Sequence, residues 1–199
     1  VAFTVLITMR GLIAGAEELI GARVALALGS YSYTVGLRHR GREIAVAGGF
    51  GFGVAAAVEK LLAANPQVRR IRLDSGGGAL SEGVSLRALI LAHGLDTYTA
   101  VECSSACISA YAGGRFRSLQ RGARMGVHLP RNWDALSANP VAASYRGELE
   151  YFHRRGLPDW FLDNWIRTGQ KFWYPTEFQL VSSGLVTRLR GLPPPLARR

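Results

Sequence analysis

Two adjacent serines and a histidine in the stretch VECSSACISAYAGGRFRSLQRGARMGVH, residues 101–128, are of the types that support nucleophilic catalysis. Ser104 and Ser105 follow an apolar segment and begin a helix-like segment of small residues, and His128 lies on a short apolar segment further along. A serine hydroxyl becomes a nucleophile when a positioned base takes its proton, and histidine is the usual base. Serine is also a favoured N-cap of a helix, so the serines alone leave a purely structural role open.

The glycine run in LDSGGG, residues 73–78, offers a second part of such a site. Consecutive glycines let the backbone turn sharply and bring its N–H groups close to a ligand. Such a turn before a helix could hold a phosphate or a developing oxyanion. The lysine and the serine or threonine of a phosphate-binding loop do not follow these glycines. The alternative is a tight strand-to-helix turn without a ligand.

The pattern around these residues predicts an α/β domain with largely parallel strand pairing. Alternating or β-branched segments indicate strands, and these lie at 42–50, 68–75, 95–102, 115–119 and 123–130. Apolar residues at helical spacing indicate helices, and these lie at 51–66, 84–94, 104–114 and within 139–168. The segment 175–189 is predicted to be a helix followed by a last strand. Strands and helices alternate with short connections, so we expect right-handed crossovers.

Composition and charge limit the classes of function. The chain has 199 residues, of which 48% are hydrophobic and 19% charged, as in a globular domain. The formal charge of +10 comes almost entirely from arginines spread along the chain, and this spread argues against a nucleic-acid-binding function. An anionic membrane surface is an alternative partner for the positive charge. Cys103 and Cys107 lack the second ligand pair of a zinc site. They indicate either two buried thiols or a local disulfide in an oxidising compartment.

Taken in order, these motifs resemble the ClpP/crotonase superfamily, which includes the Clp protease proteolytic subunit, and most closely the ClpP-like predicted bacterial envelope proteins of that group. The turn LDSGGG resembles the family's Asn-Ser-Pro-Gly-Gly turn, with Asp74 and Gly76 in place of asparagine and proline. SSACISAYAGG resembles the helix that carries the nucleophile, and ARMGVHLP, with Arg124 and His128, resembles the strand that carries the histidine. YPTEFQLVSSGLV resembles the closing helix and strand, so the similarity covers about residues 42–190.

This resemblance implies roles for particular residues. In the envelope-type relatives the element reads Cys-x-Ser-x-Cys, which puts Ser105 at the nucleophile's place, although the spacing to the histidine also fits Ser104. His128 would be the general base. The N–H groups of Gly77 or Gly78 and of Ala106 would form the oxyanion hole.

The third member of the triad is where the chain departs from the family. The family places an aspartate shortly before the closing helix, and this chain has TGQKFWY there, with Gln170 at about that place. Asp163, Asp159 or Glu177 could substitute from nearby, and a serine–histidine dyad without a third member is a further alternative. A neutral partner would orient the histidine but stabilise its cation less.

The resemblance implies a serine peptidase that acts on peptides or proteins without a metal or cofactor. One alternative is a catalytically weak or inactive scaffold with the same fold, which the missing carboxylate favours. A second is a crotonase-type acyl-CoA enzyme, although only Glu82 and Glu102 lie near the motifs as its acid or base. The resemblance also implies a homo-oligomer of trimeric or ring form.

We expect three parts along the chain: an apolar N-terminal segment at 1–34, the ClpP-like peptidase domain at 35–190, and a flexible tail rich in proline and arginine at 191–199. The opening VAFTVLITM is apolar, but Arg10 interrupts it before it reaches the roughly 18 residues of a membrane-spanning helix. Association of this segment with a membrane, and a location in the bacterial cell envelope, are therefore expectations.

Overall fold

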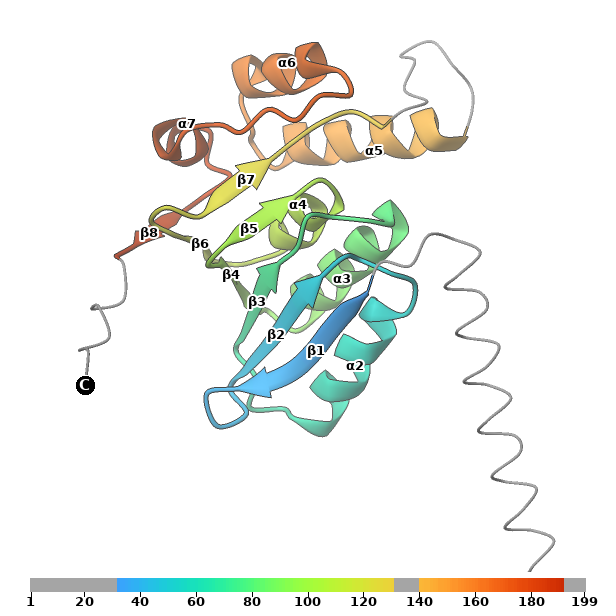
Figure 1. Ribbon diagram of the computed structural model, residues 1–199, viewed down its shortest axis with the longest axis vertical. Coiled ribbons are helices and arrows are strands. Elements are labelled where there is room, and N and C mark those ends of the chain that lie inside the picture. Colours follow the sequence, from blue (N-terminus) through green and yellow to red (C-terminus); the bar gives the residue numbers. More distant parts are fainter. Residues whose placement is uncertain (1–31, 131–139, 192–199) are drawn as a thin grey trace, which may run out of the picture.

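The computed structural model describes residues 32–130 and 140–191 of the chain. Figure 1 shows a twisted sheet with helices beside it and a further group of helices beyond one end of the sheet. The strands are β1 (Tyr33–Arg38), β2 (Glu43–Gly48), β3 (Arg70–Asp74), β4 (Asp96–Thr99), β5 (Glu102–Ser104), β6 (Arg117–Gln120), β7 (Arg124–Gly126) and β8 (Arg188–Arg190). The helices are α2 (Val54–Ala64), α3 (Leu80–Ala92), α4 (Ala106–Tyr111), α5 (Pro140–Arg154), α6 (Asp159–Thr168) and α7 (Glu177–Ser182).

Within the described residues the strands form two sheets. The larger sheet has six strands in the order β1-β2-β3-β4-β6-β8, and the smaller one pairs β5 with β7. Strand β1 runs antiparallel to β2, and every other pair is parallel. The predicted α/β class with mostly parallel pairing is therefore confirmed.

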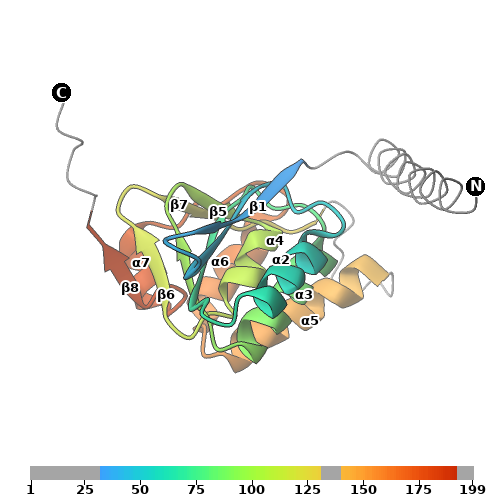
Figure 2. The ribbon, with the colours of Figure 1, turned by 90° about the horizontal axis from the view of Figure 1, so that it is seen from below.

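The core lies between the larger sheet and its helices. The segment RIRLD of β3 alternates, and its inward side chains Ile71 and Leu73 are fully buried. They pack in one cluster with Leu86 and Ile90 of α3 and with Tyr111 of α4. Figure 2 shows α2, α3 and α4 on the same side of the sheet. Burying each such side chain contributes about 1.5–3 kcal/mol, so this layer holds β3 and α4 in place.

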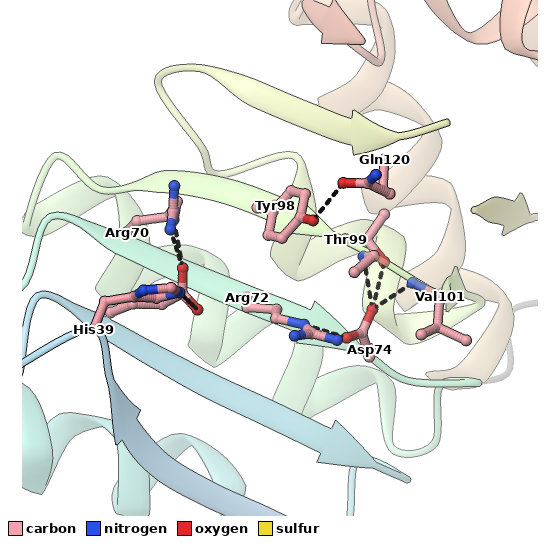
Figure 3. Close-up of polar contacts among 10 residues, drawn as sticks. His39, Arg70, Arg72, Asp74, Tyr98, Thr99, Val101 and Gln120 are labelled. Atoms are coloured by element: carbon pink, nitrogen blue, oxygen red, sulfur yellow. Dashed lines mark hydrogen bonds and ion pairs between the residues drawn. The ribbon is translucent and has the colours of Figure 1, made fainter. Parts of the chain in front are cut away.

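The opposite face of the sheet is polar. Because side chains alternate along a strand, Arg70, Arg72 and Asp74 of β3 project away from the core, as Figure 3 shows. Arg72 Nε donates to Asp74 Oδ2 at 2.5 Å, and Tyr98 Oη of the neighbouring strand donates to Gln120 Oε1 at 2.7 Å. The alternating residues of β3 thus contribute to the apolar core on one side of the sheet and to a hydrogen-bonded surface on the other.

One predicted strand is divided in two. The sequence predicts a single strand over 95–102, whereas the chain ends β4 at Thr99 and begins β5 at Glu102 in the other sheet. The N–H groups of Ala100 and Val101 donate to Asp74 Oδ1 at 2.8 and 2.9 Å in place of a strand partner. This side-chain acceptor turns the chain out of the larger sheet toward the candidate site.

The expected segment boundaries fall partly outside the described residues. Strand β1 begins at Tyr33, slightly before the domain start expected at residue 35, and pairs along its length with β2. The predicted membrane-proximal segment otherwise lies in 1–31, and the predicted tail lies mostly in 192–199, both outside the described residues. Among the helices that are described, none has the length and apolar character needed to cross a bilayer.

Candidate active site

Ser105 occupies the junction between β5 and α4 with an unusual backbone. Its φ is 54° and its ψ is −128°, a region that residues with a Cβ atom seldom adopt. The turn is fixed on both sides, because Ser105 N–H donates to the Gly126 carbonyl at 2.8 Å and Ile108 N–H donates to the Ser105 carbonyl at 2.9 Å. Strained backbone of this kind concentrates at functional sites, where the surrounding structure enforces it.

The structure brings Ser105, and not Ser104, to the histidine. Ser105 Oγ lies 2.7 Å from His128 Nε2, a hydrogen-bonding distance. Ser104 is fully buried, and its hydroxyl donates instead to Glu102 Oε1 at 2.8 Å. The two adjacent serines therefore project in different directions, and Ser105 has the geometry of a nucleophile beside its base.

The other nitrogen of the imidazole contacts the backbone. His128 Nδ1 lies 2.8 Å from the carbonyl oxygen of Leu129. A carbonyl oxygen can only accept, so Nδ1 carries the proton and Nε2 is left free to accept the Ser105 hydroxyl proton. The required tautomer is thus set without a carboxylate.

Aromatic residues hold the histidine from two sides. The carbonyl of His128 accepts hydrogen bonds from Tyr145 Oη and from Trp165 Nε1, the latter at 3.1 Å. The ring centroids of His128 and Phe172 lie 4.4 Å apart. Burial raises the pKa of Tyr145, an effect that the hydrogen bond with Trp165 partly offsets and the charge of Glu148 reinforces, so the phenol stays protonated as a donor.

The structure does not bring the expected third member to His128. Gln170 and Asp163 are both exposed, and within the described residues the ring nitrogens of His128 contact only Ser105 and Leu129. The other two carboxylates are engaged elsewhere: Asp159 with His153 at 3.5 Å, and Glu177 as acceptor of Gly122 N–H at 3.0 Å.

The glycine turn and the start of α4 each place one backbone donor next to the serine. Gly77 N–H already donates to Ser75 Oγ at 3.1 Å. The N–H groups of Gly78 and Ala106 have no acceptor in the part of the chain that the structure describes, and both residues line the same pocket as Ser105 and His128. Of the two glycines predicted from the sequence, Gly78 is therefore the one with an available donor.

Glycine is required at the turn because the serine lies against it. A Cβ atom on Gly77 would lie 2.6 Å from Ser105 Cβ and 2.8 Å from the Ser104 carbonyl oxygen, and its φ of +101° disfavours any side chain. A Cβ atom on Gly78 would lie 2.5 Å from the Phe50 carbonyl oxygen. The Gly77–Gly78 turn thus fits between Phe50, which follows β2, and Ser105 only because neither glycine has a side chain.

Asp74, at the end of β3, binds the segment that leads from β4 to β5, and Figure 3 shows its contacts with Thr99 and Val101. Its Oδ1 accepts from Thr99 Oγ1 at 3.1 Å in addition to the two backbone N–H groups that follow β4. Immediately after Asp74, Ser75 N–H donates to the Glu102 carbonyl at 2.8 Å, and Ser104 N–H donates to the Ser75 carbonyl at 2.9 Å. The donors of the glycine turn and the Ser105 hydroxyl are therefore held in one hydrogen-bonded unit.

Cys103 and Cys107 form a disulfide, a pairing that the sequence left open. Cys103 belongs to β5 and Cys107 to the first turn of α4, and both are fully buried. The bridge therefore spans Ser105 and the Ala106 N–H.

A pocket of about 320 Å³ opens beside Ser105 and His128. Its wall is mostly apolar and includes Leu80, Ala106, Pro130, Tyr145, Phe152 and Trp165. Glu148 also lines the pocket, but its carboxylate is bound to the Arg87 guanidinium through two bonds of 2.6 and 2.7 Å and to Ser109 Oγ at 2.6 Å. The carboxylate is thereby neutralised, so the pocket suits an uncharged group.

Comparison with solved structures identifies the architecture. Two structures of ClpP1 from Listeria monocytogenes, one of them a point mutant, align with TM-scores of 0.65 and 0.64 and 14% sequence identity. Each alignment covers 77% of this chain, and 94% and 93% of the respective ClpP1 chain. The chain has a ClpP-like fold. No family model and no curated protein sequence matches the chain.

Several residues of the candidate site are not apparent from the sequence. The Leu129 carbonyl that orients His128 is a backbone group and leaves no pattern in the sequence. Tyr145 and Trp165 lie on helices that read only as amphipathic, and the apolar residues around them hide their role as donors. Glu102, which accepts the Ser104 hydroxyl, was visible in the sequence as a carboxylate two residues before Ser104.

Proposed function

We propose that the chain is a serine peptidase in which Ser105 attacks the carbonyl carbon of a peptide bond. The proposal is carried by one observation: Ser105 Oγ lies 2.7 Å from an imidazole nitrogen of His128 whose tautomer leaves it free to accept a proton. General-base assistance by a positioned histidine accelerates such reactions by about 10²–10⁴-fold.

The reaction follows from these positions. As Ser105 Oγ bonds to the carbonyl carbon, its proton moves to His128 Nε2, and the carbonyl oxygen becomes an oxyanion. His128 then gives that proton to the nitrogen of the leaving amine as the C–N bond breaks, which leaves an ester on Ser105. Water attacks the ester with its proton passing to Nε2, and the acid product leaves as Ser105 recovers its proton.

Two backbone donors would stabilise the oxyanion. The N–H groups of Gly78 and Ala106 border the pocket beside Ser105 and are not used within the described fold. Donors that are already oriented require no rearrangement as the charge develops, and the loss of one such donor lowers kcat by about 10²–10³-fold in related chemistry.

The pocket indicates the class of substrate. It is lined by aromatic and aliphatic side chains, and its one carboxylate, Glu148, is paired with Arg87. An uncharged apolar side chain next to the scissile bond would bury surface there, whereas a charged one would lose its hydration without a free partner.

The hydrogen-bond partner of His128 Nδ1 favours a second candidate function, that of a scaffold with little or no activity. The Leu129 carbonyl is neutral, so it stabilises the imidazolium less than a carboxylate does. A ClpP-fold scaffold with weak or no peptidase activity is therefore the alternative. The chain's assembly into a homo-oligomer, its association with a membrane and its envelope location stay predictions.

Peptide cleavage tests the proposal and separates it from the scaffold. A mixture of unstructured peptides is incubated with the full chain, and new termini are identified by mass spectrometry. We expect cleavage next to apolar residues, abolished in Ser105→Ala and in His128→Ala. Cleavage that persists in Ser105→Ala would contradict the proposed peptidase activity. So would the absence of cleavage by the folded wild-type protein at every pH tested.

A further inference from the structure

We propose that the Cys103–Cys107 disulfide is a positioning element of the peptidase site, which makes the reactivity of Ser105 depend on the oxidised state of the bridge. The inference rests on the proposed function. It concerns a pair of residues that do not touch the substrate but fix the residue that does.

The bridge is placed across the strained residue. It joins the middle of β5 to the first turn of α4, and the residues it encloses are Ser104, Ser105 and Ala106. Two of these carry the proposed chemistry: the nucleophilic hydroxyl and an oxyanion donor. The φ of 54° at Ser105 must be held by its surroundings, since relaxation of the turn would favour a more common backbone conformation.

The hydrogen bonds around this turn hold its strand end and its helix end, but each bond acts on one end only. Ser104 N–H bonds to Ser75 and Ser105 N–H to Gly126, which anchor the strand side. Ile108 N–H bonds to the Ser105 carbonyl and begins the helix. The disulfide is a second covalent link between the strand and the helix, besides the backbone through Ser105, so it restricts how the helix can move relative to the strand.

The small size of the loop separates this role from general stabilisation. A disulfide stabilises the folded state mainly by restricting the unfolded chain, and that effect grows with the length of the loop it closes. The sequence separation of Cys103 and Cys107 is 4, so the bridge restricts the unfolded chain less than one that closes a long loop. Its restraint on the local geometry of the turn does not depend on loop length.

Local geometry matters because the reaction depends on it. Ser105 Oγ and His128 Nε2 are at hydrogen-bonding distance, and a displacement of about 1 Å lowers rates by about 10²-fold. Reduction by an external dithiol breaks the S–S bond and leaves two thiols on the protein while the dithiol becomes a disulfide, so two electrons and two protons are transferred. The freed turn then has no covalent restraint against relaxing at Ser105.

The dependence suits an oxidising compartment, where a disulfide of this kind persists. Both sulfurs belong to fully buried residues, so reduction must wait for local opening of the turn. We therefore infer that the oxidised form is the working form of the site.

The test compares oxidised and reduced full-length protein. Labelling by a fluorophosphonate probe is followed over time, and the state of both cysteines is measured in the same sample by alkylation and mass spectrometry. We expect the second-order labelling rate to fall about tenfold or more on reduction while the protein stays folded, and to recover on reoxidation. The variant Cys103→Ala/Cys107→Ala should label slowly with or without dithiol.

A matched control separates positioning from loss of packing. Ile108→Val removes one buried methylene group from the same helix turn and leaves the bridge intact, so it should label at the wild-type rate. Equal labelling of oxidised and fully reduced wild type would overturn the inference and leave the peptidase proposal in place. If oxidised wild type never labels, the peptidase proposal fails, and the inference fails with it.

Discussion

His128 Nδ1 lies 2.8 Å from the carbonyl oxygen of Leu129, the next residue in the chain. The hydrogen-bond partner of Nδ1 therefore belongs to the same backbone segment as the histidine, and it moves together with His128. This arrangement sets the tautomer but places no negative charge behind the ring. Catalysis by this site should therefore be independent of the carboxylates that the sequence suggested as orienting groups.

The first prediction concerns Asp163. Its side chain is exposed on α6, and among the described residues it has no contact with His128. Asp163→Asn should therefore label with a fluorophosphonate within about twofold of wild type, whereas His128→Ala should lose about 10²–10⁴-fold. A loss in Asp163→Asn comparable to that in His128→Ala would show that a carboxylate acts on the ring after all.

Neighbouring glycines give the second prediction. Gly77→Ala places a Cβ 2.6 Å from Ser105 Cβ at a φ of +101°, so it should destabilise the fold by about 1–3 kcal/mol and nearly abolish labelling. At Gly76 no other atom of the described structure lies within 4 Å of an added Cβ. Gly76→Ala should stay within about 0.5 kcal/mol in urea unfolding and keep its labelling rate. Equal effects of the two variants would contradict the packing described for the turn.

Asp74 gives the third prediction. Asp74→Ala removes the acceptor of the Ala100 and Val101 N–H groups and should cost about 1–3 kcal/mol in urea unfolding, with slower labelling. Asp74→Asn keeps a side-chain oxygen and should recover most of the labelling rate. The control is Asp96→Ala, which loses only an exposed pair with Arg115 and should change stability by less than about 1 kcal/mol. Labelling at the wild-type rate in Asp74→Ala would exclude its role in positioning the turn.

Glu102 gives the fourth prediction, which concerns pH. Partial burial acts to raise its pKa, but the hydrogen bonds from Ser104 and Arg124, the charge of Arg124 and the hydrogen bond from Tyr174 together lower it below the ordinary 4.5. Because the folded-state pKa is lower than the unfolded one, this contribution to stability is present above pH 4.5 and is lost as the pH falls through the folded value.

Unfolding midpoints in urea between pH about 3 and 7 measure this contribution. Glu102→Gln should be less stable than wild type at neutral pH, and the difference should shrink as the pH falls. Asp163→Asn, at an exposed position, should follow the wild-type curve. A constant difference between Glu102→Gln and wild type over the whole range would contradict the lowered pKa.

Local pattern was sufficient for the fold where burial alone decides the element. The alternation of RIRLD and the helical spacing of α3 reflect which side chains face the core, and both elements are predicted, although α3 begins at Leu80, before the predicted start at 84. The break between β4 and β5 was not, because it depends on Asp74, a residue distant in sequence that accepts two backbone hydrogen bonds there. A pattern of apolar residues carries no record of such an acceptor.

The site was predictable to a similar degree. Family resemblance pointed to Ser105, His128, Ala106 and either Gly77 or Gly78, and of these two glycines Gly78 lines the same pocket as the other three residues. It also pointed to an orienting side chain at Gln170 or Asp163, whereas the orienting group is the Leu129 carbonyl. The strained φ of Ser105 and the Cys103–Cys107 bridge likewise follow from three-dimensional geometry that the spacing of residues does not specify.

Intact-mass spectrometry of the fluorophosphonate-treated chain tests the central claim most directly. One covalent adduct should form on the oxidised protein and map to Ser105 after digestion. It should be absent from Ser105→Ala and retained in Ser104→Ala, since the Ser104 hydroxyl is buried against Glu102. A folded wild-type protein that acquires no adduct, or an adduct that maps to Ser104 or to any residue other than Ser105, would contradict the account.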